Sequence, residues 1–329
     1  MSRQRSILAL TWAATWALCT AALAPQAMAQ ASYPDRPVKV IVALPAGGSA
    51  DMIARMVTQK MAAELGQPFV VDNKAGASGQ IGTPLVAKAA PDGYTLMVSP
   101  ASFLTTNKSI FKTLPYDPEA DFVPITKLVN QPMVLVVKDA QKFPNVAAVL
   151  AAARAAPGQL TYASSGDGSP QHLAALMFST RTRASMLHVP YKGGAPAIND
   201  TLSGHVDMLF AVLPEALPHI QSGKLHAIGL MAPQRSALLP QVPTMAESGI
   251  AQVELSAWVG LLAPARTPQP VIDRLQRAAH AALTGETAAK LAANGMEVAP
   301  GTGAQLKDSI AQEIQLHSEL VKAAGITPQ

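Results

Sequence analysis

The sequence has little charge, few aromatic side chains and a single cysteine. Charged residues make up 14% of the 329 residues and aromatic residues 5%, whereas soluble domains carry about 25% charged residues. The hydrophobic fraction of 49% is large enough to bury a core, which excludes an intrinsically disordered chain. The same composition excludes collagen, a coiled coil and a disulfide-stapled scaffold.

Long apolar runs are missing everywhere except at the N-terminus, which is typical of an export signal. Arg3 and Arg5 precede an apolar, uncharged run at 7–23, and Ala27-Met28-Ala29 matches the small-x-small pattern cut by signal peptidase. We predict that residues 1–29 are removed and that the protein is exported. An uncleaved anchor is the alternative, and no later stretch is long enough to span a bilayer.

Without this leader the mature chain has almost no net charge. Two of the 25 basic residues and no acidic ones lie in the leader, so 23 basic residues face 21 acidic ones, a net charge of +2. No Lys and Arg run is interleaved with aromatic residues, so nucleic acid is not an expected partner. Cys19, the single cysteine, is removed with the leader, so we expect neither disulfides nor thiol chemistry in the mature protein.

Short apolar runs alternate with segments of helical periodicity along the mature chain. The first block predicts helices over 49–65 and up to about residue 90, between strands at 38–44, 69–71 and 94–99. The second block repeats this alternation, with strands at 132–138, 160–164, 186–190, 206–211 and 225–230. The βαβ order predicts a parallel sheet with right-handed crossovers.

The length and the last part of the chain predict two α/β lobes. One hydrophobic core rarely grows beyond about 250–300 residues. After an apolar segment at 253–262, three helical stretches follow with hardly any strand between them, and they pack well if the chain returns to the first lobe. We predict lobe 1 from 30–130 plus 253–329 and lobe 2 from 131–252, joined only by crossings near residues 130 and 252 that form a hinge.

Several loops at predicted strand carboxyl ends combine glycine, serine and a helix start. They lie at 44–51, 75–80, 99–102, 164–170 and 191–196. Ligands of open α/β sheets bind beyond these strand ends, and each helix start favours an anion by about 0.3–1 kcal/mol. One such loop is an ordinary helix start, but five at corresponding positions predict an anion-binding cleft.

The motifs of common enzymes are missing. Gly76 to Gly82 reads G-x-x-G-x-x-G rather than a dinucleotide fingerprint, and no P-loop, nucleophile elbow or zinc-protease motif occurs. The seven histidines show no metal-ligand spacing, so neither a metal nor a cofactor is expected. A serine with His172 and Asp207 leaves a hydrolytic triad as a formal alternative.

Three polar residues have two interpretations each. His172 lies either in the cleft or on a helix surface. Asp51 is favoured as an anchor of its own loop. Asp207 interrupts a predicted apolar strand, so its carboxylate must be paired or reach the cleft.

The order of these motifs resembles the Bug-type, or TctC-like, extracytoplasmic solute receptors. Matching segments cover essentially the whole mature chain, at 33–38, 45–51, 72–79, 91–96, 168–173, 189–197 and 258–260. The resemblance implies an α/β, two-lobed periplasmic-binding-protein fold of the Venus flytrap, type II-like class. It also implies a periplasmic receptor, not an enzyme, that captures a small organic carboxylate for the integral membrane permease of a tripartite tricarboxylate transporter. We expect a monomer.

The resemblance also implies which residues contact the ligand, largely through backbone N–H groups in lobe 1. These are Gly47, Gly48, Ser49, Ser78, Gly79 and Ser99 in lobe 1, and Ser164, Gly166, Ser169, His172, Gly193 and Asp207 in lobe 2. Two other functions stay open at this point: an exported hydrolytic enzyme that uses the same cleft, and a sensory receptor that presents its ligand-bound form to a membrane protein.

Overall fold

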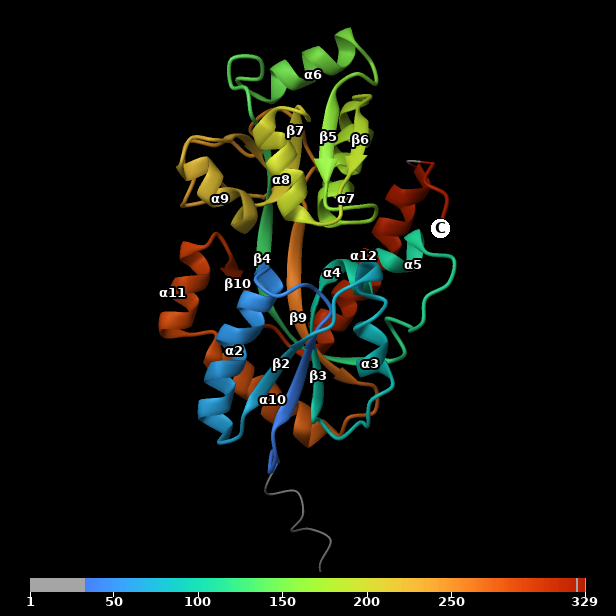
Figure 1. Cartoon of the computed structure of the whole chain (residues 1–329), viewed down its shortest axis with the longest axis vertical. Helices are drawn as coiled ribbons and strands as arrows, with labels where there is room; N and C mark the ends of the chain where they lie inside the picture. Colours follow the sequence, from blue (N-terminus) through green and yellow to red (C-terminus); the bar gives the residue numbers. More distant parts are fainter. Residues whose placement is uncertain (1–32, 324, 329) are drawn as a thin grey trace, which may run out of the picture. The chain divides into compact units, whose positions relative to one another are not determined.

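The computed structural model describes residues 33–323 and 325–328, so the predicted leader lies outside the described residues. The described helices and strands belong to the compact unit Arg36–Gln329 (Figure 1). Within this described part, no helix combines the length and apolarity needed to cross a bilayer.

The first three strands form the parallel sheet that the alternation predicts. The strand order is β2-β1-β3, with β1 (Val38–Val42), β2 (Phe69–Asn73) and β3 (Thr95–Pro100). The connecting helix α2 (Ser49–Leu65) buries Ile53, Val57 and Met61, because residues three or four apart share one helix face.

The next predicted helix, up to about residue 90, is much shorter than expected. The chain instead forms a 3-10 turn, η1 (Ala77–Gly79), and a five-residue helix, α3 (Thr83–Ala87). Glycines at 76, 79 and 82 explain the difference, because each costs a helix about 1 kcal/mol relative to alanine.

Two long antiparallel strands link the two blocks. Strand β9 (Ser256–Pro264) pairs with β3 and with the first half of β4 (Phe122–Val137). Only the second half of β4 was expected, because Pro124, Lys127 and Asn130 interrupt the apolar pattern of its first half. Residue 130, the first predicted crossing, therefore lies inside a continuous strand, which also pairs with β10 (Glu297–Val298).

The second block continues the same sheet. The second half of β4 lies between β7 (Met208–Val212) and β8 (His226–Leu230), both antiparallel to it. Strand β5 (Thr161–Ser164) runs parallel to β7 and to β6 (Leu187–Pro190). The helices are α6 (Val146–Ala155), α7 (Pro170–Thr182), α8 (Gly194–Ser203) and α9 (Leu213–Gln221). Because β5, β6 and β7 are parallel, their carboxyl ends meet at one edge.

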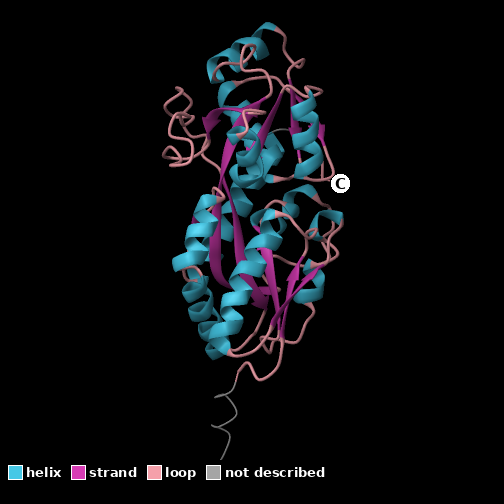
Figure 2. Cartoon of the chain, turned by 60° about the vertical axis from the view of Figure 1, so that its left-hand side comes forward, coloured by secondary structure: helices cyan, strands magenta, loops and turns pink. Residues whose placement is uncertain are grey.

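The C-terminal helices return to the first block. Helix α10 (Gln269–Ala282) packs against α2, and α12 (Gly303–Ala323) packs against β4. Helix α11 (Gly285–Ala293) precedes β10, and Figure 2 shows helices on both sides of the strands. This packing agrees with the expected return of the chain, while the exact lobe boundaries stay predictions.

One apolar contact corrects the expectation that only the two crossings join the blocks. Short helices α4 (Ala101–Leu104) and α5 (Asn107–Ile110) follow β3. Ile110 of α5 forms a buried cluster with Leu173 of α7 and Val321 of α12. The start of α7 is therefore packed against the first block and the C-terminal helix.

Candidate functional site

The loop that follows β1 is held by a buried carboxylate. Asp51 Oδ2 accepts hydrogen bonds from the Gly47 N–H, 2.9 Å, and from Arg55 Nε, 3.0 Å. Arg55 also donates to Asn73, whose amide donates to the Leu44 carbonyl, 3.1 Å. Burial alone would raise the pKa of Asp51, but the hydrogen bonds from Arg55 and Gly47 outweigh it and lower the pKa. Asp51 is thus a loop anchor, as favoured from the sequence.

This anchoring leaves a helix start without a side-chain cap. Gly48 is the N-cap of α2, and no side chain accepts from the first turn. The first N–H groups of a helix have no intrahelical acceptor, so the Gly48 and Ser49 end of α2 offers donors to an anion. Gly48 is exposed and Ser49 is half-buried. The Gly47 N–H is already used by Asp51.

The other lobe 1 residues differ in accessibility. Ser78 is exposed, and its carbonyl accepts from Asn107, 2.9 Å. Gly79 is buried against the Phe103 ring, where a side chain would collide, and its N–H donates to Gly76. Ser99 is fully buried in β3 and donates to the Pro100 carbonyl. Of these three predicted residues, only Ser78 is open to a ligand.

The loop that follows β5 folds around the Ser164 hydroxyl. Ser164 Oγ accepts from the Gly166 N–H, 3.1 Å, and lies 2.7 Å from His188 Nε2. Farther along, Ser169 caps α7 by accepting from the His172 N–H, 3.3 Å. Ser164 and Ser169 therefore shape this loop with their hydroxyl groups.

His172 supports the same loop from the protein interior. Its side chain is buried, its Nδ1 accepts from the Gly168 N–H, 3.1 Å, and its ring stacks on His188 at 4.0 Å between centroids. Tyr162 also stacks on His188, 4.9 Å between centroids, and lies 6.5 Å from the His172 ring. Burial, followed by the neighbouring His188, lowers the pKa of His172 to about 4. His172 is neither of the predicted alternatives, because it lies inside the lobe.

Asp167, His172 and His188 have ligand atoms within 4.8 Å of one another. Their geometry does not suit a metal ion. The two imidazole rings are nearly parallel, 17° apart, so their in-plane lone pairs point side by side rather than toward one ion. The Nδ1 atom of His172 is also already an acceptor for Gly168.

Asp207 is not brought to this group. Its carboxylate accepts from the Thr161 N–H, 3.0 Å, and from Lys142 Nζ, 2.8 Å. Thr161 begins β5, so Asp207 lies at the amino edge of the parallel strands, opposite the loops. The formal triad of a serine with His172 and Asp207 is therefore wrong, since His172 and Asp207 lie at opposite ends of the parallel strands.

Another serine, histidine and aspartate do lie next to one another in space. Ser164 Oγ is 2.7 Å from His188 Nε2, and His188 Nδ1 is 3.6 Å from Asp167 Oδ1. Ser164 is fully buried, however, and its hydroxyl also contacts both backbone groups of Gly166. A nucleophile must reach its substrate, so this arrangement is a structural hydrogen-bond network.

The residues at the remaining strand ends complete the candidate site. Gly193 is the N-cap of α8 and is half-buried, with no side-chain cap. Glu215 lies in the first turn of α9, close to Gln171 and Gly194. Sequence reasoning missed Glu215 because α9 itself was missed. The signal that could have indicated this helix was Pro214, two residues after the apolar strand β7, since proline is favoured in a first helical turn.

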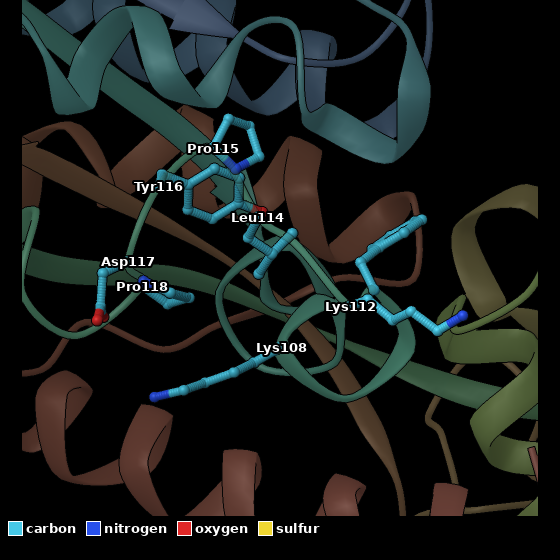
Figure 3. A pocket seen from close by; sticks show the side chains of 8 residues that line it. Lys108, Lys112, Leu114, Pro115, Tyr116, Asp117 and Pro118 are labelled. Atoms are coloured by element: carbon cyan, nitrogen blue, oxygen red, sulfur yellow. The ribbon is translucent and has the colours of Figure 1, made fainter. Parts of the chain in front are cut away.

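A separate surface cavity of about 460 Å³ lies beside α5 and the chain after it. Its lining includes Lys108, Lys112, Tyr116 and Asp117. Figure 3 shows the two lysine side chains reaching in opposite directions, and Lys108 pairs with Glu119. Because the positive charges do not converge, this cavity is a weaker anion site than the helix starts.

Comparison with known proteins identifies relatives over nearly the whole chain. The family model described as the tripartite tricarboxylate transporter family receptor matches residues 53–326. Protein BugT of Bordetella pertussis is 38% identical over 310 residues, which cover 94% of this chain and 95% of that protein.

Solved structures of similar proteins share the fold. Rpa4515 of R. palustris, solved with adipate, has a TM-score of 0.84 at 32% identity, covering 90% of this chain and 100% of that chain. MatC of Rhodopseudomonas palustris, with bound malate, has a TM-score of 0.79 at 31% identity, covering 88% of this chain and 100% of that chain. The α/β fold of this chain is thus that of two-lobed periplasmic solute-binding proteins, as the sequence motifs implied.

Proposed function

This chain belongs to the tripartite tricarboxylate transporter receptor family, and from that premise we propose that it captures a small organic carboxylate in the periplasm and delivers it to a membrane permease. In this proposal it binds its ligand without transforming it and acts as a monomer. The leader at residues 1–29 directs its export.

The observation that carries the proposal is the start of α2. A loop fixed by Asp51 presents the Gly48 and Ser49 end of a 17-residue helix without any side-chain cap. Such an end combines free N–H donors with the positive end of the helix dipole, which suits a carboxylate. We assign one ligand carboxylate to Gly48, Ser49 and Ser78.

The opposite wall of the proposed cleft comes from the second block. There the half-buried residues are Gly166, Ser169 and Gly193. We assign these groups to the rest of the ligand. Ser164 and His172 act indirectly in this proposal, by holding the loop in shape, and Asp207 is no longer included.

Native mass spectrometry followed by calorimetry with a panel of carboxylates tests the proposal. A receptor should bind at least one of them with 1:1 stoichiometry, and each ligand should be recovered unchanged after prolonged incubation. A product of altered mass, or labelling of Ser164 by a fluorophosphonate probe, would favour the hydrolase. A signalling role would be favoured if the ligand-bound protein were captured by a sensor kinase rather than by a permease.

A further inference from the structure

Three polar residues meet where the helices of the second block begin. Ser165 follows β5, Gln171 lies in the first turn of α7, and Glu215 lies in the first turn of α9. Because β5, β6 and β7 are parallel, these positions share the edge at which ligands of open α/β sheets bind. In Figure 1 the helices α7, α8 and α9 lie beside these strands.

The carboxylate of Glu215 receives very little hydrogen bonding. Ser165 Oγ donates to Gln171 Oε1, 2.8 Å, which orients the Gln171 amide so that its Nε2 donates to Glu215 Oε2 at 3.4 Å, a long bond. The carboxylate packs against the backbone of Gly194 at the start of α8, where a side chain would collide with it. A carboxylate has about four acceptor positions, so most of its capacity is unused by the described residues.

No cation neutralises Glu215 within the described part of the chain. The ion pairs formed there do not include it. Charged groups on the elements packed against α9 are engaged elsewhere, since Asp200 of α8 accepts from Tyr191 and Lys127 of β4 lies over the Trp258 ring. Lys192, next to Gly193, is exposed. A half-buried carboxylate without a cation is costly unless it is protonated or a ligand supplies the missing partner.

We infer that Glu215 makes the cleft prefer a carboxylate whose far end carries an N–H donor, either an ammonium or a primary amide, over a dicarboxylate. This inference rests on the proposed function and names the ligand class within it. An N–H donor fills the unused acceptor positions of Glu215, and an ammonium also neutralises its charge. A second ligand carboxylate at the same place would meet like charge.

The same contacts make the preference depend on pH. Burial raises the pKa of Glu215 to about 7, only partly offset by Gln171. Above that pH Glu215 is ionised and repels a second carboxylate; below it the neutral carboxyl group can donate a hydrogen bond to one. Dicarboxylate binding then needs a proton, so its affinity should fall by up to about tenfold per pH unit above 7.

Isothermal titration calorimetry at pH 8 with matched ligands tests the inference. The pairs are succinamate with succinate, glutaramate with glutarate, and adipamate with adipate, because each amide replaces one carboxylate of nearly the same shape. The ammonium probes are 4-aminobutanoate and 6-aminohexanoate. For the chain length that fits, wild-type protein should prefer the amide or ammonium ligand by about tenfold or more.

The variant Glu215→Gln keeps the shape of the side chain and removes its charge. It should reduce this preference to less than about threefold and abolish the pH dependence of dicarboxylate binding, because a glutamine both donates and accepts. The matched control is Glu286→Gln, which removes an exposed carboxylate on α11 that pairs with Lys290 and should leave the preference unchanged.

Two results would overturn the inference, and they are distinguishable. If dicarboxylates bind wild-type protein at pH 8 as tightly as their amides, and Glu215→Gln changes nothing, Glu215 does not select the ligand although the receptor function stands. If no carboxylate binds wild-type protein or either variant, the proposed function fails and the inference fails with it.

Discussion

The loops after β1 and after β5 follow equivalent strand ends but are built in opposite ways. The first loop is anchored by hydrogen bonds to Asp51, which also pairs with Arg55, and the start of α2 that follows it has no side-chain cap. The second closes around its own hydroxyl and imidazole groups, with Ser164 and His172 buried under it. In the proposed cleft the first loop therefore suits any carboxylate. The second loop and nearby Glu215 bring titratable groups to the side that we propose distinguishes one ligand from another.

Acid should destabilise the second loop most strongly. Burial lowers the pKa of His172 to about 4, so the neutral ring is favoured in the folded protein. Its contribution is fully present above the unfolded value of about 6.5 and is lost as the pH falls toward 4, up to about 3 kcal/mol. Urea unfolding at several pH values should show that His172→Gln loses about that much less stability over this range than wild type.

The exposed His205 supplies the control for this prediction. Its side chain is 72% exposed, so His205→Gln is the same substitution made without removing a buried ring. The assignment of His172 as a buried, neutral support would be contradicted if His172→Gln and wild type lost stability in parallel between pH 6.5 and 4.

The first loop should respond to a change of its anchor. Asp51→Ala removes the acceptor of the Gly47 N–H and the partner of Arg55. Hydrogen bonds to a charged group contribute about 1.5–3 kcal/mol, so the free energy of unfolding should fall by about 2 kcal/mol. Carboxylate affinity should fall too, because the start of α2 loses its fixed position.

Calorimetry and urea unfolding together check this prediction. Arg55→Met is a useful comparison, since it keeps the bond between Asp51 and Gly47 and should therefore cost less affinity. Wild-type affinity in Asp51→Ala would mean that the loop position does not matter for binding.

A smaller effect is expected from Ser164→Ala in the second loop. The substitution leaves the half-buried Gly166 N–H without its acceptor and removes the contact with His188. Because this N–H is only half-buried, the cost should lie at the lower end of the range for a buried unsatisfied donor, about 1 kcal/mol. The free energy of unfolding should fall by that amount, and a fall in affinity without any loss of stability would instead assign Ser164 a direct role in binding.

The smallest effect is expected from Ser49→Ala. Ser49 is not the cap of α2, because Gly48 occupies that position, so stability should hardly change. A lost neutral hydrogen bond to the ligand should cost about 1 kcal/mol of binding free energy. Gly48→Val should weaken binding more, because its side chain blocks the approach of a carboxylate to the backbone; equal and negligible effects in calorimetry would remove this loop from the site.

Much of this fold could be predicted because its long elements have clear patterns. Helix α2 has apolar residues at helical spacing and ends before Gly66, and the parallel strands β1 to β3 are short β-branched runs. The first half of β4 could not be recognised, because its polar side chains are accommodated only by pairing with β9, more than a hundred residues away. Such tertiary pairing leaves little local signal.

The candidate site was predicted less completely than the fold. The sequence indicates the strand-end loops but does not tell which of their side chains turn inward. Ser164 and His172 were therefore expected to contact the ligand, whereas both are buried under the loop. Asp207 was assigned to a strand without regard to which end of that strand it occupies. Glu215 was missed together with α9, because Pro218 inside the helix obscured its pattern.

The central claim is that the start of α2 holds a ligand carboxylate, and amide NMR during a ligand titration tests it most directly. When a binding carboxylate is added to the labelled protein, the Gly48 and Ser49 amide protons should shift strongly downfield with the affinity measured by calorimetry, and Asp51→Ala should weaken that response. Unchanged Gly48 and Ser49 signals at saturation, with shifts confined to the cavity around Lys108 and Lys112, would contradict the account.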